Sequence, residues 1–233
     1  VVVIAVIYKK LPVPNRLLLA DAKRLFQIGG DMFVRTGLLL FYLTMATRTA
    51  TRISTEAGAA HQAIRQFWTF TALFLDAFSL SAQSLIAFFI GRETLNHARK
   101  VVRVVFIWSF AMGCILMVSM LVGYVPFVKL FVPPEAVTVF TVPWLIASFS
   151  QPINSFAFAT DGIHWGTGDF RYLRNGMIAA TFTGILGIVL LEFFAVETLV
   201  RLWIITVIWI AVRGCAGVLR VYPAIGNSIW KTK

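Results

Sequence analysis

The sequence predicts an all-α, polytopic membrane helix bundle, and three observations support that fold class. Hydrophobic residues make up 59% of the 233 residues and charged residues only 13%, which is more apolar surface than one water-soluble core can bury. Apolar runs of about 20 residues, the length that spans a bilayer as a helix, recur along the chain. None of these runs alternates apolar and polar residues as a membrane β-strand does.

The predicted elements follow in order from these runs. Residues 1–30 are expected to hold the end of a truncated span, residues 1–8, and then a cytoplasmic linker in which Pro12 and Pro14 stop the helix. Residues 31–222 are expected to form one six-helix lobe, and residues 223–233 a cytoplasmic tail. The predicted spans are 32–50, 67–90, 101–125, 137–161, 176–194 and 199–219, with an external loop and a short interfacial piece in "YVPFVKLFVPPEAV".

The uneven distribution of basic residues predicts the orientation. The segment before the first span and the connections after the second, fourth and sixth hold sixteen of the 21 Lys and Arg residues, Arg35 and Arg213 among them, and the opposite side holds five. Because basic residues near span ends stay in the cytoplasm, the leading segment and the C-terminus are placed there. The net charge of +11 lies between apolar runs and not along one face, so no nucleic-acid partner is expected.

The polar residues show no pattern of an enzyme or of a metal site. Cys114 and Cys215 lie in apolar runs without CxxC or Cys/His spacing, so buried free thiols are expected, with no metal and no cofactor. The "GTG" at 166–168 lacks the preceding strand and the third glycine of a dinucleotide fingerprint. No Ser/His/Asp set marks a nucleophile, so the chain is not expected to be an enzyme.

One polar stripe follows the second predicted span. At 100° per residue its members fall within an arc of about 100°, and the phenylalanines of this span lie mostly elsewhere. A charge at the bilayer centre costs about 2.5 to 3.5 kcal/mol, so Asp76 is expected to face the protein interior or a water-filled cavity. It either lines a pathway or is a structural carboxylate bonded to a neighbouring helix. The stripe consists of Gln62, Arg65, Thr69, Asp76, Ser79 and Gln83.

A second polar face occurs in the fourth predicted span, where Gln151, Asn154 and Asp161 are spaced to share one side of a helix. Pro152 removes a backbone donor and frees the carbonyl near Ser148, which predicts a bend. Kinked helices with polar faces are how transporters build sites at membrane depth, although a kink can also serve packing alone.

These residues resemble those of a known family. The chain is similar over almost its whole length to the C-terminal half of a multidrug and toxic compound extrusion (MATE) transporter, and most similar to the DinF-like branch of bacteria and plastids. The AAHQ, LDAFSLSAQ, DG and GTGD elements occur in the family's order. The similar stretches are "DMFVRTGLLL", "AGAAHQAIRQFWTFTALFLDAFSLSAQSLIAFFIGRE", "QPINSFAFATDGIHWGTGDFRYLRNGM" and "WIITVIWIAVRG".

The resemblance implies twelve helices in two six-helix lobes, with substrate moving between the lobes in exchange for H⁺ or Na⁺. Residues 1–8 would end the sixth helix, and the six predicted spans would be helices seven to twelve. The DinF branch has its coupling carboxylate on the first helix of the N-terminal lobe, which this sequence lacks, so coupling residues are not carried over. The candidate pathway residues are Asp76, Asp161, Gln83, Gln151, Asn154, Arg65 and Gln62.

The expected function is therefore the C-terminal lobe of a cation-coupled antiporter that exports small organic, cationic compounds. Its expected partners are the lipid bilayer, the substrate, the coupling ion and an N-terminal lobe, in a bacterial inner membrane or alternatively the plastid envelope. A lipid-linked precursor flippase of the same superfamily would require more basic residues inside the cavity than Arg65 alone. A membrane-embedded enzyme would require clustered carboxylates or a nucleophile.

Overall fold

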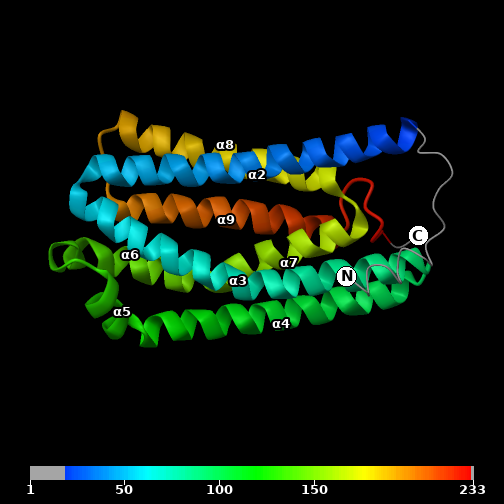
Figure 1. The fold of residues 1–233 in the computed structure, drawn as a ribbon, viewed down its shortest axis with the longest axis horizontal. Coiled ribbons are helices and arrows are strands. Elements are labelled where there is room, and N and C mark those ends of the chain that lie inside the picture. The colour runs from blue at the N-terminus through cyan, green and yellow to red at the C-terminus, as the bar shows by residue number, and fades with distance from the viewer. Residues whose placement is uncertain (1–18, 232–233) are drawn as a thin grey trace, which may run out of the picture.

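The computed structural model describes residues 19–231, and the regular elements in that range are all helical, which confirms the all-α fold class. The helices run along one elongated bundle (Figure 1). The helix end expected at residues 1–8 lies outside the described residues. The elements are α2 (Leu19–Ile53), α3 (Thr55–Gly91), α4 (Leu95–Val122), α5 (Tyr124–Phe131), the 3-10 turn η1 (Pro134–Ala136), α6 (Val137–Phe149), α7 (Gln151–Thr167), α8 (Phe170–Phe193) and α9 (Leu199–Val221).

Each predicted span corresponds to one helix or to a helix pair. Helices α3, α4, α8 and α9 are long and apolar enough to cross a membrane, and the pair α6–α7 adds a fifth crossing when it is counted as one span. Helix α2 contains the predicted span 32–50 and has 35 residues, but it is less apolar because charged residues such as Arg35 and Arg48 interrupt it. It begins at Leu19, so residues 19–30, which were expected to belong to the linker, are helical and continuous with the predicted span.

The bend predicted from Pro152 is present. Helix α6 ends at Phe149, α7 begins at Gln151, and the two axes differ in direction by 47°. Pro152 lies in the first turn of α7, where a missing N–H removes no helical hydrogen bond. The short helical piece expected in the proline-rich loop is α5.

Helix α7 lies at the centre of the bundle and packs against α3, α4 and α9. Glycines allow very close approach: a Cβ atom built on Gly162 would lie 2.1 Å from the carbonyl oxygen of Ser79 on α3. One built on Gly217 of α9 would lie 2.3 Å from Oγ1 of Thr160 on α7. Small residues permit such contacts between membrane helices. Most side chains of α7 are therefore buried against protein.

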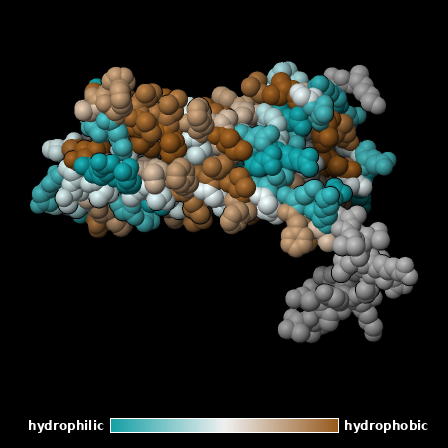
Figure 2. Space-filling model, turned by 90° about the horizontal axis from the view of Figure 1, so that it is seen from above, coloured by the Kyte–Doolittle hydropathy of each residue, from teal (hydrophilic) through white to brown (hydrophobic). Residues whose placement is uncertain are grey.

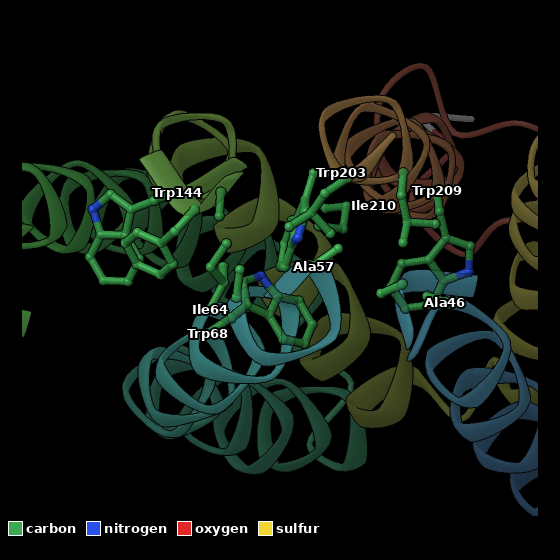
Figure 3. Close-up of a cluster of buried hydrophobic side chains, with 14 of the residues drawn as sticks. Ala46, Ala57, Ile64, Trp68, Trp144, Trp203, Trp209 and Ile210 are labelled. Atoms are coloured by element: carbon green, nitrogen blue, oxygen red, sulfur yellow. The ribbon is translucent and has the colours of Figure 1, made fainter. Parts of the chain in front are cut away.

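The buried core combines small residues, mostly alanines, with large aromatic side chains such as Trp203 and Trp209 (Figure 3). Trp144 of α6 is fully buried and donates its indole N–H to the Met120 carbonyl oxygen at 3.1 Å. Tyr42 of α2 stacks on Trp209 of α9, with ring centroids 4.5 Å apart. These contacts join helices that are far apart in the sequence.

The outer surface is apolar along most of the bundle. Side chains such as Phe33 (80% exposed) and Phe182 (69% exposed) point outward, and Figure 2 shows hydrophilic residues gathered toward the ends. An exposed apolar belt of this extent matches a lipid-facing surface. Cys215 is exposed and Cys114 half-buried, in contrast to the buried thiols expected.

The segment after α9, expected as a cytoplasmic tail, packs against the start of α4, because its buried residues belong to one cluster with Ala98 and Val102. Ala224 and Trp230 are buried, and Arg99 donates to the Trp230 carbonyl oxygen at 3.3 Å. Ser228 donates to the Arg220 carbonyl oxygen at 2.7 Å, which fixes the middle of the segment.

Candidate functional site

The centre of the candidate site is a buried charged cluster in which three helices meet. Asp161 of α7 accepts a hydrogen bond from Arg35 of α2 and lies 3.5 Å from the guanidinium of Arg213 of α9. All three side chains are less than 10% exposed. Because α7 packs closely on α3, α4 and α9, its polar face points into the bundle and brings Asp161 to both arginines. We call these three residues the charged cluster.

Aromatic rings complete the environment of the two guanidinium groups. Arg35 lies over the ring of Trp165 at 5.2 Å, and Arg213 lies over the ring of Phe158 at the same distance. Cation–π contacts of this kind stabilise desolvated arginines. The Nε groups of both arginines have no partner among the described residues. A cavity of about 10 Å³ borders the cluster, about the smallest volume that holds a single water molecule.

Asp76 of α3 lies beside the charged cluster but is not part of it. Ser79, one turn further along α3, is the residue against which Gly162 packs, so Asp76 faces the same interior region as Asp161. Its carboxylate interacts electrostatically with Asp161, Arg213 and Arg35. Within residues 19–231 it is half-buried and forms neither a hydrogen bond nor an ion pair. Asp161 is thus a neutralised carboxylate, whereas Asp76 has no directly bonded partner in the described part of the chain.

The other residues of the polar face of α7 are deeply buried. The Gln151 side chain accepts from Thr71 Oγ1 at 3.4 Å and donates to the Met120 sulfur at 3.4 Å. Asn154 is fully buried, and neither atom of its amide has a partner in the described part of the chain. Polar groups left unpaired in a bundle interior are unusual and mark a site where water or another ligand can bind.

The remaining candidates on α3 lie away from the cluster. Arg65 donates to Thr47 Oγ1 of α2 at 3.0 Å, near the turn that joins α2 and α3. Gln62 is exposed and lines an open cavity of about 600 Å³ together with aromatic side chains that include Phe67 and Phe127. Gln83 is half-buried, and its carbonyl oxygen contacts the backbone at Gly166. The structure therefore brings Asp76, Asp161 and Asn154 to the interior and leaves Gln62 on an open face.

Arg35 and Arg213 are the residues that the sequence analysis did not identify as part of the site. Both were assigned to cytoplasmic connections, yet both are buried in the bundle. A signal was present, because each lies inside a predicted span, in "FVRTG" and in "WIAVRGC". A basic residue with apolar neighbours on both sides needs an acidic partner, and the predicted spans contain three carboxylates, Asp76, Asp161 and Glu192.

Two further ion pairs strengthen the same end of the bundle. Arg174 of α8 contacts Asp31 of α2 at 2.6 Å, and Arg220 of α9 contacts Asp169, which precedes α8, at 2.6 Å. The ring of Tyr172 lies 4.8 Å from the Arg220 guanidinium. These pairs tie α2, α8 and α9 together around the charged cluster.

An apolar bundle with a bent helix pair and a charged interior is typical of the helical domains of membrane transporters. A profile of the family described as MatE matches residues 32–193, and the chain belongs to this family. It is a multi-pass membrane protein of a transporter family, and it is not an enzyme.

Relatives in Arabidopsis thaliana support this membership. Protein DETOXIFICATION 44, chloroplastic, is 29% identical over 211 residues, which is 90% of this chain and 40% of that protein. Protein DETOXIFICATION 43 is 28% identical over 211 residues, covering 89% and 39% of the two chains. Protein DETOXIFICATION 45, chloroplastic, is 31% identical over 151 residues, or 64% and 27%. The chain spans about 40% of the length of the first two of these relatives.

Solved structures share the fold. One is described as the outward-facing conformation of a multidrug resistance MATE family transporter of the MOP superfamily, with a TM-score of 0.80 and 15% identity. The aligned region covers 89% of this chain and 46% of the solved transporter chain. A MOP superfamily transporter from Pyrococcus furiosus, described as having reverse polarity of the binding pocket, also gives 0.80 at 16% identity, with the same coverage. The fold is thus that of about half of such a transporter.

Proposed function

We propose that this chain forms the C-terminal lobe of a DinF-like MATE transporter that exports small organic compounds across a membrane in exchange for H⁺ or Na⁺. The order of the sequence elements supports the C-terminal position. The observation that carries the proposal is Asp76, which has no hydrogen bond or ion pair among residues 19–231 and lies next to the charged cluster, where two arginines and one carboxylate leave a net positive charge. Ionisable residues at membrane depth are costly and mark ion or substrate pathways.

The two interior carboxylates take different roles in this proposal. Asp161 is held by Arg35 and Arg213, so it positions α2, α7 and α9 around the pathway. Asp76 has no such partner and is the group that can exchange a cation or contact a positively charged substrate. The Asn154 amide, unpaired among the described residues, offers a further polar contact about two turns before Asp161 on α7.

The face with Gln62 and Thr69 is proposed to meet an N-terminal lobe. Both side chains are exposed, although they lie on a helix that crosses an apolar environment. The aromatic cavity next to Gln62 lies on this face and would become part of the passage between two lobes. The chloroplastic names of two relatives favour the plastid envelope over a bacterial inner membrane as the location.

A second candidate is a lipid-linked precursor flippase of the same superfamily. The buried Arg35 and Arg213 favour it, because a phosphate-bearing substrate requires basic groups inside the cavity. The flippase is nevertheless the less favoured function, because both arginines pair with Asp161 and an anionic substrate would have to compete with that carboxylate.

The test uses the full-length protein that contains this chain, reconstituted in liposomes with an imposed H⁺ or Na⁺ gradient. We expect gradient-dependent transport of ethidium, a fluorescent organic cation, and a loss of about tenfold or more in Asp76→Asn. Glu135→Gln, at an exposed carboxylate in η1, is the matched control and should transport normally. Wild-type rates in Asp76→Asn would refute the role of Asp76. Translocation of a lipid-linked pyrophosphate without ethidium transport would establish the flippase instead.

A further inference from the structure

A second cavity lies at the end of the bundle, where the start of α4 meets the segment after α9. Its volume is about 620 Å³. Among residues 19–231, four basic side chains line it and no acidic side chain does. Arg99, Lys100 and Arg103 come from α4, and Lys231 comes from the C-terminal segment. We call it the basic pocket.

The positive charge of this pocket is not neutralised within the described part of the chain. Lys100, Arg103 and Lys231 form no ion pair there, and Arg99 donates only to neutral oxygens, those of Asn96, Trp230 and Lys231. The buried arginines elsewhere, such as Arg213 and Arg220, each have a carboxylate partner. The basic pocket is thus complementary to an anionic group.

The floor of the pocket is apolar and continues onto a lipid-facing surface. Val102 and Val221 are buried beneath the basic groups. Further along α4, Val104, Ile107 and Trp108 are each more than half exposed. The predicted hydrocarbon span starts at residue 101, so the basic groups lie at headgroup level and the exposed apolar residues at acyl-chain level.

One side of the basic pocket is formed by the ordered segment after α9. The pocket is therefore an enclosed site and not a row of solvated positive charges on a helix. Arg99 holds the C-terminal segment through its backbone carbonyls, and Trp230 is buried. Ser228 accepts from the Trp230 backbone N–H at 3.2 Å and donates to the Arg220 carbonyl oxygen. The segment therefore encloses the basic side chains of α4.

From this geometry we propose that the basic pocket binds the headgroup of an anionic phospholipid, with the acyl chains lying along Val104, Ile107 and Trp108. The phosphate contacts Arg99, Arg103 and Lys231, whose donors suit its oxygens. The proposal concerns lipid recognition at the membrane surface and does not depend on the substrate or the coupling ion.

The test measures binding of dioctanoyl phosphatidylglycerol to the protein in a neutral detergent by native mass spectrometry. We expect the variant Lys100→Gln/Arg103→Gln/Lys231→Gln to lose affinity for this lipid by about tenfold or more. The reason is that each basic group near the surface contributes to the attraction of an anionic lipid. The matched control is Lys23→Gln/Arg24→Gln/Arg171→Gln. It removes the same charge from exposed residues outside the pocket and should change affinity less than about twofold.

Three further measurements identify the source of the phosphate and separate a loss of binding from a loss of folding. Dioctanoyl phosphatidylcholine should bind much more weakly than phosphatidylglycerol, and glycerol 3-phosphate should not compete. Equal binding of the two lipids, equal losses in both triple variants, or competition by glycerol 3-phosphate would each overturn the proposal. Arg103→Gln alone changes one exposed side chain and should still weaken phosphatidylglycerol binding, so an undiminished affinity there also counts against it.

Discussion

The two ends of the bundle are held together by different chemistry. At the charged end, where α2 begins and α9 finishes, the pairs Asp31–Arg174 and Asp169–Arg220 surround the charged cluster. At the aromatic end, where α3 begins, Phe127 stacks on Trp144 with centroids 4.6 Å apart. The ion pairs there, Arg48 and Arg52 with Glu192, are at 3.4 and 3.7 Å and have exposed arginines.

This difference shows which end has one fixed arrangement of helices. Buried ion pairs are directional, and breaking one leaves an uncompensated charge, so the charged end cannot rearrange by small steps. Aromatic contacts tolerate several geometries with a small change in energy. We therefore expect the charged end to respond much more strongly to single substitutions.

The largest effect is expected for Asp161→Ala. The change leaves Arg35 and Arg213 buried without a carboxylate, at a cost of about 3 to 5 kcal/mol. The melting temperature in detergent should fall strongly, with loss of monodisperse protein. Additional replacement of both arginines by Gln should restore part of the stability, because it removes the unpaired charges. A single Asp161→Ala variant as stable as the parent protein would contradict the comparison.

An intermediate effect is expected for Gly162→Ala. Its methyl group would meet the Ser79 carbonyl oxygen at 2.1 Å, so α3 and α7 must separate, at a cost of about 1 to 3 kcal/mol. Gly37→Ala is the matched control, because nothing lies within 4 Å of the added Cβ. It should leave the melting temperature unchanged or raise it, since Ala is the better helix former. Equal behaviour of the two variants would mean that α3 and α7 are not in backbone contact.

The smallest effect is expected at the other end, for Glu192→Gln. Both of its arginine partners are more than half exposed, so the change should cost less than about 1 kcal/mol. The hydrogen bond from Thr49 at 3.1 Å can be kept by the amide oxygen. Any difference in melting temperature should shrink in high salt. A loss comparable to that of Asp161→Ala would remove the distinction between the two ends.

Much of the fold could be predicted because it depends on local properties of the sequence. The runs that form α3, α4, α8 and α9 could be recognised as spans because their length and hydropathy are properties of each run alone. The break before α7 could be expected from Pro152, because a continuous helix would need its N–H to bond the Ser148 carbonyl oxygen, whereas a helix that starts at Gln151 does not. The helical conformation from Leu19 onward was not predicted, because no apolar run of span length begins there and only residues 32–50 met the length and composition of a span.

The charged cluster could not be predicted because its members are distant in the sequence. Arg35 and Asp161 are 126 residues apart, and nothing local indicates that they meet. The orientation argument treats every Lys and Arg near a span end as solvated. Arg35 and Arg213 were therefore placed in cytoplasmic connections, although both lie inside the bundle. The stripe on α3 was drawn for one helix alone, whereas the tertiary arrangement buries Ser79 and leaves Gln62 open.

The sequence distance between the members of the charged cluster also sets an order of events during synthesis. At roughly 5 to 20 residues per second, Arg35 leaves the ribosome on the order of ten seconds before Asp161, and Arg213 follows later on α9. Until then an arginine at membrane depth lacks its carboxylate, which costs about 2.5 to 3.5 kcal/mol. A half-made chain therefore presents an unpaired Arg35 to the insertion machinery until α7 supplies Asp161, and α9 then adds Arg213 to the same carboxylate.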